Sequence, residues 1–331
     1  MSTTRPSSSW QSRLDPELAS VLPYMPSMDL SDVRKARESL QQLVGQSPRD
    51  LAGAERLDVA DHLVPSLDDG PPVPVRVYRR RDLPRSAPGI VWFHGGGFVL
   101  GSVELEHLST AQLALDLDVV VVSVEYRLAP EHPFPAGIDD CFAALVWTAE
   151  EAVDLGIDTG RLAVGGMSAG GALSAAVALR SRDQAGPGLC FQLLGIPVLD
   201  DRLDTPSMLE FEDTPLWNRH LAIQSWAHYL GEPLTEGPAP VRDHVSPYAA
   251  PAREPNLAGL PPAYVSTGEL DPLRDEGIAY AARMVQAGVS VELHNFPGAF
   301  HGSSLVTGAT VSKRMNEDVR AALRRGLHLD S

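Results

Sequence analysis

Cysteine is scarce in this sequence. The 331 residues include two cysteines, Cys141 and Cys190, and both stand among apolar neighbours. This setting is typical of small buried side chains rather than of a disulfide framework or a metal site, and it favours a reducing compartment. The ten histidines are scattered, without the helix-face spacing of metal ligands, so we expect neither a metal nor a cofactor.

Long apolar runs are also missing. The opening segment, MSTTRPSSSWQSRL, has no apolar stretch of the length that a signal peptide or a membrane span requires. We therefore expect a cytoplasmic protein with a mobile leader rich in serine and threonine, and no membrane partner.

Positive charge is in the minority. Lys and Arg total 27 against 43 Asp and Glu, which gives a formal net charge of −16. This charge would repel a polyphosphate backbone or an anionic lipid surface, so we expect no nucleic-acid partner. The only short basic run, Arg79–Arg81, is expected in a solvated turn. Apolar residues make up 44% of the sequence, enough for one large core.

Short apolar runs rich in β-branched residues alternate with longer helical patterns from residue 55 onward. This rhythm indicates an α/β fold, with parallel strands joined by crossover helices. The expected strands are Leu57–Leu63, Val73–Arg79, Gly89–Phe93, Val119–Val124, Leu162–Gly165, Cys190–Ile196, Ala263–Thr267 and Val289–Phe296. We expect the first two to form an antiparallel pair, because Gly70 and the prolines after it favour a turn that begins at Asp68 and Asp69.

Two stretches fall outside this rhythm. Residues 15–50 show helical periodicity before any strand, and residues 200–240 form a helical segment interrupted by prolines. A long excursion between core elements is more often a functional lid than an ordinary insertion, so both stretches could form a cap over the site. The expected division is a leader with cap helices (1–52), the first part of the catalytic core (53–199), a cap insertion (200–243) and the second part of the core (244–331).

A candidate nucleophile lies where a strand turns sharply into a helix. Ser168 follows the strand Leu162–Gly165 and precedes an Ala- and Leu-rich helix, with Gly166 and Gly170 on either side. This GxSxG spacing is that of a nucleophile elbow, in which close packing leaves room only for small residues two positions away. The helix N-terminus would also direct backbone N–H groups toward an anion that forms there.

Three successive glycines follow the strand Gly89–Phe93, in the segment His94–Phe98. Such glycines expose backbone N–H groups without side-chain obstruction, as an oxyanion hole requires. A dinucleotide-binding loop would need glycine at position 100, which is Leu100, so that alternative fails. An ordinary turn after the strand is the remaining alternative.

An acid and a base are expected after the nucleophile, in the order Ser, acid, His. Asp271 follows the strand Ala263–Thr267, at the edge where open α/β sheets place their sites. Glu269 and Asp275 are rival candidates for the acid. His301 follows the last strand on a loop at the same edge, whereas His294 lies within that strand and is expected to be a packed structural residue.

Taken together, these motifs resemble those of the hormone-sensitive-lipase family of bacterial esterases within the α/β-hydrolase superfamily. The resemblance rests on the glycine loop, on the segments Tyr126–Ala136 and Asp271–Glu276, on the elbow and on the His301 loop, and it covers most of the chain from about residue 85. It implies a mostly parallel eight-stranded sheet, flanked by helices, under a small helical cap.

The resemblance also implies a role for each site residue. Ser168 would be the nucleophile, Asp271 the acid and His301 the base. The backbone N–H groups of Gly96, Gly97 and Ala169 would form the oxyanion hole, with Gly95 as a close alternative, and Tyr126 and Arg127 would be structural. Two positions depart from the family. Met167 stands where an acidic or small polar residue is usual, and Ser303 stands where Phe is frequent.

The expected activity is hydrolysis of short-chain carboxylic esters through an acyl-enzyme, with a small-molecule ester as substrate. An amidase, a lactonase or a peptidase on the same triad is an alternative, and so is a non-catalytic scaffold that binds a small ligand. Trp217, Trp226 and Tyr229 could line an acyl or alcohol pocket or could pack the cap onto the core. A homodimer through an edge strand such as Val289–Phe296 is plausible by resemblance.

Overall fold

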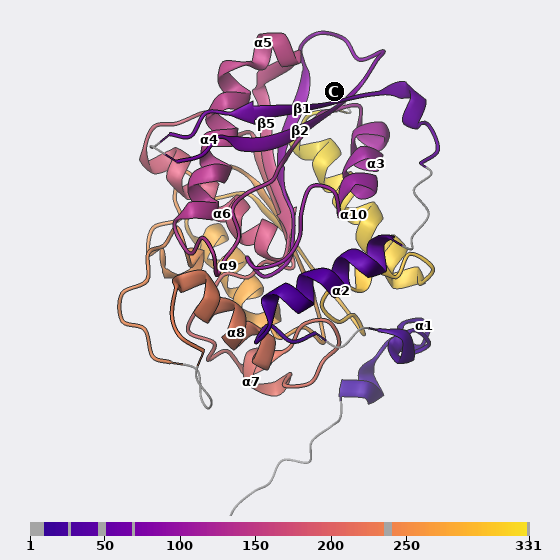
Figure 1. The fold of residues 1–331 in the computed structure, drawn as a ribbon, viewed down its shortest axis with the longest axis vertical. Helices are drawn as coiled ribbons and strands as arrows, with labels where there is room; N and C mark the ends of the chain where they lie inside the picture. Colours follow the sequence, from indigo (N-terminus) through magenta and orange to yellow (C-terminus); the bar gives the residue numbers. More distant parts are fainter. Residues whose placement is uncertain (1–9, 26–27, 46–50, 68–69, 235–239, 330–331) are drawn as a thin grey trace, which may run out of the picture.

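An eight-stranded sheet forms the centre of the structure, a computed structural model that describes residues 10–25, 28–45, 51–67, 70–234 and 240–329 (Figure 1). Its strands are β1 (Leu57–Val64), β2 (Val73–Arg80), β3 (Ala87–Phe93), β4 (Val120–Val124), β5 (Ile157–Met167), β6 (Phe191–Gly195), β7 (Ala263–Gly268) and β8 (Val291–Phe296). All eight expected strands are confirmed. The first nine residues of the expected leader, and Asp68 and Asp69 of the expected turn, lie outside the described residues.

The strand order is β1-β2-β4-β3-β5-β6-β7-β8. β1 pairs with β2 in antiparallel fashion, as expected. β2 also pairs with β4 in antiparallel fashion, and all the other neighbours are parallel. β5 begins at Ile157 rather than at Leu162, where Ile157 pairs with Ala87. The sequence pattern missed this extension because the segment 158–161 is polar and partly or fully exposed.

Helices cover both faces of the sheet. On one face, α4 (Ala136–Glu150), α6 (Ala169–Asp183) and α9 (Arg274–Gln286) contribute to the larger apolar core. On the other, α3 (His107–Leu117) and α10 (Thr310–Gly326) pack with the smaller core. Every residue of β3, β4 and β6 is buried, which explains why these strands are continuous apolar runs rather than alternating patterns.

One local expectation, the solvated turn at Arg79–Arg81, was wrong for its first two residues. Arg79 and Arg80 belong to β2, and both are only partly exposed. The Arg79 guanidinium donates to the carbonyl of Leu83 at 2.8 Å, and Arg80 pairs with Asp82 at 2.7 Å. Antiparallel pairing with β1 and these local acceptors extend the strand through residues whose charge suggested a turn.

The two stretches outside the α/β rhythm pack together at one end of the sheet (Figure 1). They form α1 (Pro16–Ala19) and α2 (Val33–Gly45) near the N-terminus, and α7 (Pro206–Glu210) and α8 (Arg219–Leu230) in the insertion. The Gln224 side chain of α8 accepts a hydrogen bond from the Leu30 N–H at 3.0 Å, and His228 donates to the Leu30 carbonyl at 2.7 Å. The remaining helices are α5 (Ala152–Leu155) and the short 3₁₀ segments Trp10–Arg13, Leu22–Tyr24, Ala54–Arg56, Pro251–Arg253 and Ser303–Leu305.

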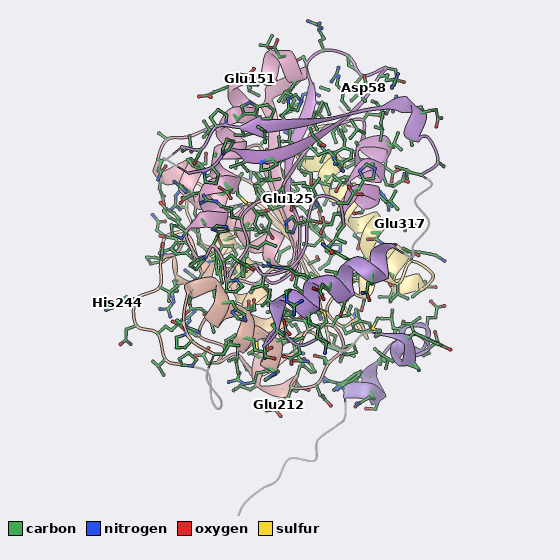
Figure 2. The ribbon with its side chains drawn as sticks, in the orientation of Figure 1. Asp58, Glu125, Glu151, Glu212, His244 and Glu317 are labelled. Carbon is green, nitrogen blue, oxygen red and sulfur yellow. The ribbon has the colours of Figure 1, made fainter. Side chains whose placement is uncertain are left out.

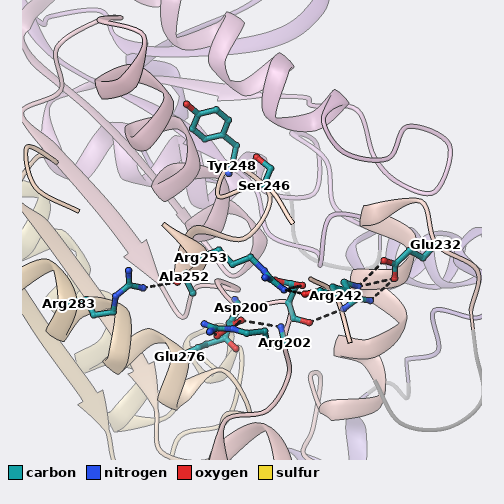
Figure 3. Close-up of polar contacts among 11 residues, drawn as sticks. Asp200, Arg202, Glu232, Arg242, Ser246, Tyr248, Ala252, Arg253, Glu276 and Arg283 are labelled. Carbon is teal, nitrogen blue, oxygen red and sulfur yellow. Dashed lines mark hydrogen bonds and ion pairs between the residues drawn. The ribbon is translucent and has the colours of Figure 1, made fainter. Parts of the chain in front are cut away.

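Ion pairs fasten the insertion to the core where the chain leaves and re-enters it (Figure 3). The side chain of Asp201 is fully buried and accepts two hydrogen bonds from Arg253, at 2.6 and 2.9 Å. Arg242 donates to the Asp201 carbonyl at 2.9 Å and pairs with Glu232, just beyond α8. The base of the insertion is therefore held by charge-assisted contacts.

Acidic side chains are spread over the surface, as the negative net charge requires. Asp58, Glu151, Glu212 and Glu317 are exposed on elements far apart in the fold (Figure 2). In the part of the chain that the structure describes, no helix is long and apolar enough to cross a membrane. Both cysteines are free thiols, with Cys141 buried and Cys190 half-buried.

Candidate active site

Ser168 occupies a strained turn between β5 and α6. Its φ of 58° and ψ of −119° lie in a region that residues with a side chain rarely adopt. The Ser168 N–H donates to the Gly195 carbonyl at 2.7 Å, which holds the turn against the neighbouring strand. A Cβ on either Gly166 or Gly170 would overlap the carbonyl oxygen of Phe93. The expectation that only small residues fit around the serine is therefore confirmed by the backbone packing.

The three residues expected to act together are brought into one hydrogen-bonded chain. The Oγ of Ser168 lies 2.9 Å from His301 Nε2, and His301 Nδ1 lies 2.7 Å from Asp271 Oδ2. Because an ionised carboxylate can only accept, Nδ1 carries the proton and Nε2 is free to accept from the serine hydroxyl. All three residues are buried, with 7%, 7% and 1% of the surfaces of Ser168, His301 and Asp271 exposed.

The rivals for the acid have other partners. Glu269 accepts the Gly298 N–H at 2.8 Å. Asp275 accepts the Ser207 N–H at 2.7 Å and pairs with Arg274 at 2.7 Å. Asp271 instead sits just past β7, where its second oxygen accepts the Leu273 N–H at 2.9 Å. Its carboxylate is therefore held from both sides in the orientation that faces His301.

His294 lies apart from this chain, as expected from its place inside β8. Its ring contacts Asp318 at 2.8 Å and Glu292 at 3.0 Å, and 30% of its side chain is exposed. The residue is structural, but it belongs to a half-exposed ion-pair cluster rather than to the packed interior. The reason is that β8 is the outermost strand of the sheet.

The glycine loop after β3 presents backbone N–H groups beside the serine. Gly96 and Gly97 have φ values of 126° and 58°, which favour glycine. No described residue accepts a hydrogen bond from the N–H of Gly96, Gly97 or Ala169, whereas the Gly95 N–H donates to Glu106 at 2.9 Å. Gly95 is thus committed elsewhere, and the alternative in which it serves as an anion donor is disfavoured.

His94 holds the glycine loop as a neutral residue. It is fully buried, and its Nδ1 lies 2.8 Å from the Gly95 carbonyl, so Nδ1 must carry the proton. Burial lowers the pKa of His94 to about 4. The Tyr126 ring stacks on the imidazole at 4.1 Å, and its hydroxyl donates to the His94 carbonyl at 2.8 Å. The Arg127 guanidinium pairs with Asp140 at 2.8 Å, so both residues of the Tyr-Arg pair have structural contacts, as expected.

The cap aromatics divide between the two alternatives. Trp226 and Tyr229 are buried against Phe98, and the rings of Tyr229 and Phe98 stack at 3.9 Å, so these two pack α8 onto the core. Trp217 lies beside the site, with its ring 5.7 Å from the ring of His301. It follows a strained turn in which Leu216 has a φ of 60° and the Trp217 N–H donates to the Pro215 carbonyl at 2.7 Å.

Sequence reasoning did not identify Glu106 as part of this region. Its carboxylate accepts the Gly95 N–H at 2.9 Å and the Trp92 indole N–H at 2.8 Å. Burial raises the pKa of Glu106 above its usual value, and the two hydrogen bonds partly offset this rise. No motif in the segment 101–107 signals this contact, because it joins the residue before α3 to the glycine loop and to Trp92 of β3.

A Ser-His-Asp chain at the carboxyl edge of a mostly parallel sheet, beside free backbone N–H groups, defines a serine hydrolase arrangement. The family described as having the alpha/beta hydrolase fold matches residues 90–305 of this sequence. The chain belongs to the alpha/beta hydrolase fold family.

Several similar proteins are named as esterases. The chain is 40% identical over 321 residues to the carboxylesterase NlhH of Mycobacterium tuberculosis, a match that covers 95% of this chain and 97% of the relative. It is 40% identical over 295 residues to the esterase LipI of the same organism, covering 87% of each chain. The solved structure of a bacterial heroin esterase matches with a TM-score of 0.91 at 48% identity, over 96% of this chain and 98% of that one. The resemblance to the hormone-sensitive-lipase family of bacterial esterases is thus confirmed.

Proposed function

We propose that this protein is a carboxylesterase that hydrolyses short-chain carboxylic esters through an acyl-enzyme formed on Ser168. The observation that carries the proposal is the unbroken chain from Ser168 Oγ through His301 to Asp271, with contacts of 2.9 and 2.7 Å. The relatives named as esterases over nearly their whole length support the same reaction class.

The reaction begins at the serine hydroxyl. His301 Nε2 takes the proton from Ser168 Oγ as the oxygen bonds to the ester carbonyl carbon. The resulting oxyanion accepts hydrogen bonds from the N–H groups of Gly96, Gly97 and Ala169, each worth about 2.7 to 4 kcal/mol of barrier lowering. Asp271 keeps the imidazole in the required tautomer and stabilises the imidazolium without taking its proton.

The second half of the reaction reverses these proton transfers. Nε2 returns its proton to the departing alkoxide oxygen, which leaves as an alcohol and breaks the original ester bond. A water molecule then attacks the acyl carbon while Nε2 accepts its proton. Nε2 gives this proton to Ser168 Oγ as the acyl–oxygen bond breaks, which releases the acid and restores the serine hydroxyl. The substrate is a small-molecule ester, because the buried serine and the indole of Trp217 leave little room above the glycine loop.

Further expectations from the sequence belong to this proposal. The cap comprises residues 1–52 and 200–243, and the catalytic core comprises 53–199 and 244–331. The protein is cytoplasmic, in keeping with its free thiols, and it forms a homodimer through β8, the outer strand of the sheet. Analytical ultracentrifugation of the full chain tests the dimer, which a single monomeric species would contradict.

The decisive experiment compares wild-type protein with Ser168→Ala on p-nitrophenyl esters of increasing acyl length. We expect activity that is highest on short acyl chains and that the substitution abolishes. Ser123→Ala is the matched control, because Ser123 is buried on β4, which β3 separates from β5 and the nucleophile. Full activity in Ser168→Ala would contradict the proposal. Hydrolysis of a p-nitroanilide or a lactone, with no ester hydrolysis, would replace it with an amidase or a lactonase.

A further inference from the structure

We infer that Glu106 is a positioning residue for the oxyanion hole, acting through its hydrogen bond to the Gly95 N–H. The inference rests on the proposed function, since it assigns a role within that reaction. Glu106 does not touch the reacting atoms. It acts on the loop that carries two of the proposed oxyanion donors, Gly96 and Gly97.

The contacts of Gly95 explain how this action reaches the site. The Gly95 N–H donates to Glu106 Oε1 at 2.9 Å, and the Gly95 carbonyl accepts from His94 Nδ1 at 2.8 Å. The Gly95 carbonyl and the Gly96 N–H belong to one planar trans peptide, in which they point in opposite directions. Holding both polar groups of Gly95 therefore sets the direction of the Gly96 N–H, which is a proposed oxyanion donor.

Gly95 lies directly between Glu106 and the nucleophile. A Cβ placed on Gly95 would lie 3.7 Å from Ser168 Cβ, 3.9 Å from Glu106 Oε1 and 3.1 Å from the Met167 carbonyl oxygen. A small shift of this residue would therefore move the loop against the elbow. Oxyanion stabilisation requires donors about 2.7 to 3.1 Å from the developing charge, so a shift of a few tenths of an ångström is costly.

Support for the loop has to come from outside the elbow itself. Met167, the residue before the nucleophile, has a thioether that cannot form strong hydrogen bonds, and it packs against the apolar core beside Gly195. Glu106 instead supplies a carboxylate on the other side of the glycine loop. Its second oxygen is anchored by the Trp92 indole N–H at 2.8 Å, on β3 itself. The loop is thus braced against the strand from which it departs.

Both oxygens of Glu106 accept hydrogen bonds from N–H donors, so the ionised form suits the site. A protonated carboxyl, or an amide, would place a donor opposite one of these two N–H groups. Because burial raises the pKa of Glu106, protonation begins at a higher pH than for an exposed glutamate. The hydrogen bonds by which Glu106 holds the glycine loop therefore weaken as the pH falls.

The test measures kcat and KM for p-nitrophenyl acetate in Glu106→Gln, Glu106→Ala and wild-type enzyme. We expect kcat to fall about tenfold in E106Q and about 100-fold in E106A, comparable at most to the loss of one oxyanion donor, with KM changed less than about threefold. Affinity for a trifluoromethyl ketone, which forms a hemiketal oxyanion on Ser168 Oγ, should fall in parallel. The acid limb of the kcat profile should be shallower in E106Q, because one of its titrating groups is gone.

A second variant distinguishes a loss of loop positioning from a general loss of correctly folded protein. In E106Q/W92F the opposing indole N–H is absent, so the glutamine can turn its carbonyl oxygen toward Gly95, and kcat should recover most of the E106Q loss. Glu125→Gln is the matched control: Glu125 is also partly buried with its pKa raised by burial, and it accepts the Val103 N–H at 2.6 Å instead of an N–H of the glycine loop. It should keep wild-type kcat.

Active-site titration with a phosphonate gives the fraction of competent enzyme in each sample. A kcat loss that disappears after this correction would overturn the inference, as would an E106A enzyme within twofold of wild type. Equal losses in E125Q would also overturn it. A wild-type protein without Ser168-dependent ester hydrolysis would instead overturn the proposed function, and the inference with it.

Discussion

The indole of Trp217 lies against Gly97 on one side and near His301 on the other. A Cβ placed on Gly97 would meet the indole Cη2 at 2.6 Å, and the ring of Trp217 is 5.7 Å from that of His301. With 4% of its surface exposed, the side chain fills space directly above the proposed oxyanion donors. The insertion therefore places this indole beside the catalytic histidine, where the strained turn at Leu216 holds it.

Truncating this indole should lengthen the acyl chains that the enzyme accepts. In Trp217→Ala, the ratio of kcat/KM for p-nitrophenyl octanoate to that for the acetate should rise at least about tenfold, because the removed ring opens an apolar cavity. Steady-state kinetics on the ester series provide the measurement. Trp147→Ala, on α4 and away from the site, should leave the ratio unchanged. A ratio unchanged in W217A would show that the pocket lies elsewhere.

Replacing Asp271 should lower kcat far more than replacing Glu269 or Asp275. Asp271→Asn should lower kcat about 1,000- to 10,000-fold, because an amide can donate to Nδ1 and favour the wrong imidazole tautomer. Glu269→Gln and Asp275→Asn are the matched controls, since their carboxylates contact Gly298 and Ser207 rather than His301. Their kcat values should stay within about tenfold of wild type. A larger loss in either control than in D271N would reassign the acid.

His94 should make the fold sensitive to acid. Its pKa is lowered to about 4 by burial, whereas the unfolded chain takes up the proton near the usual value of 6.5. Between these values the unfolded state binds more protons, so the free energy of unfolding falls as pH falls from 6.5 to 4, by roughly 3 kcal/mol in total. Urea unfolding across this range, compared with His94→Asn, gives the contribution. The variant keeps a donor near the Nδ1 position and should lose this part of the pH dependence.

If the free energy of unfolding changed with pH equally in wild type and H94N, His94 would not be the source of the acid sensitivity. The comparison between the two proteins is needed because Glu106 and Glu276 have pKa values raised by burial. Groups of that kind contribute stability at low pH and lose it as pH rises through their folded pKa, which is the opposite trend.

Attachment of the insertion to the core should depend on a buried ion pair. Replacing Arg253 with Met leaves the Asp201 carboxylate buried and unpaired, and should lower the free energy of unfolding by about 3 to 5 kcal/mol. Adding Asp201→Asn to this variant removes the charge and should restore part of the loss. Thermal and urea unfolding of both variants test this. No difference between the single and double variants would show that the pair does not couple the insertion to the core.

Much of the site could be predicted because its residues occur in short motifs with demanding local geometry. Gly166, Ser168 and Gly170 are recognisable since the backbone at the elbow excludes larger residues, and the structure confirms that exclusion against Phe93. The catalytic acid was harder to predict from the sequence. Glu269, Asp271 and Asp275 fall within seven positions, and only the register of the loop after β7 decides which carboxylate meets His301.

The sequence by itself determined where the strands fall along the chain, the elbow, the glycine loop and the two helical stretches outside the α/β rhythm, because each depends on local periodicity or on backbone freedom. Tertiary structure alone decided three further points. It commits the Gly95 N–H to Glu106, it places Trp217 rather than Trp226 beside His301, and it extends β5 back to Ile157. Each depends on contacts between elements distant in the chain or on packing geometry, which leave no periodic trace in the amino-acid order.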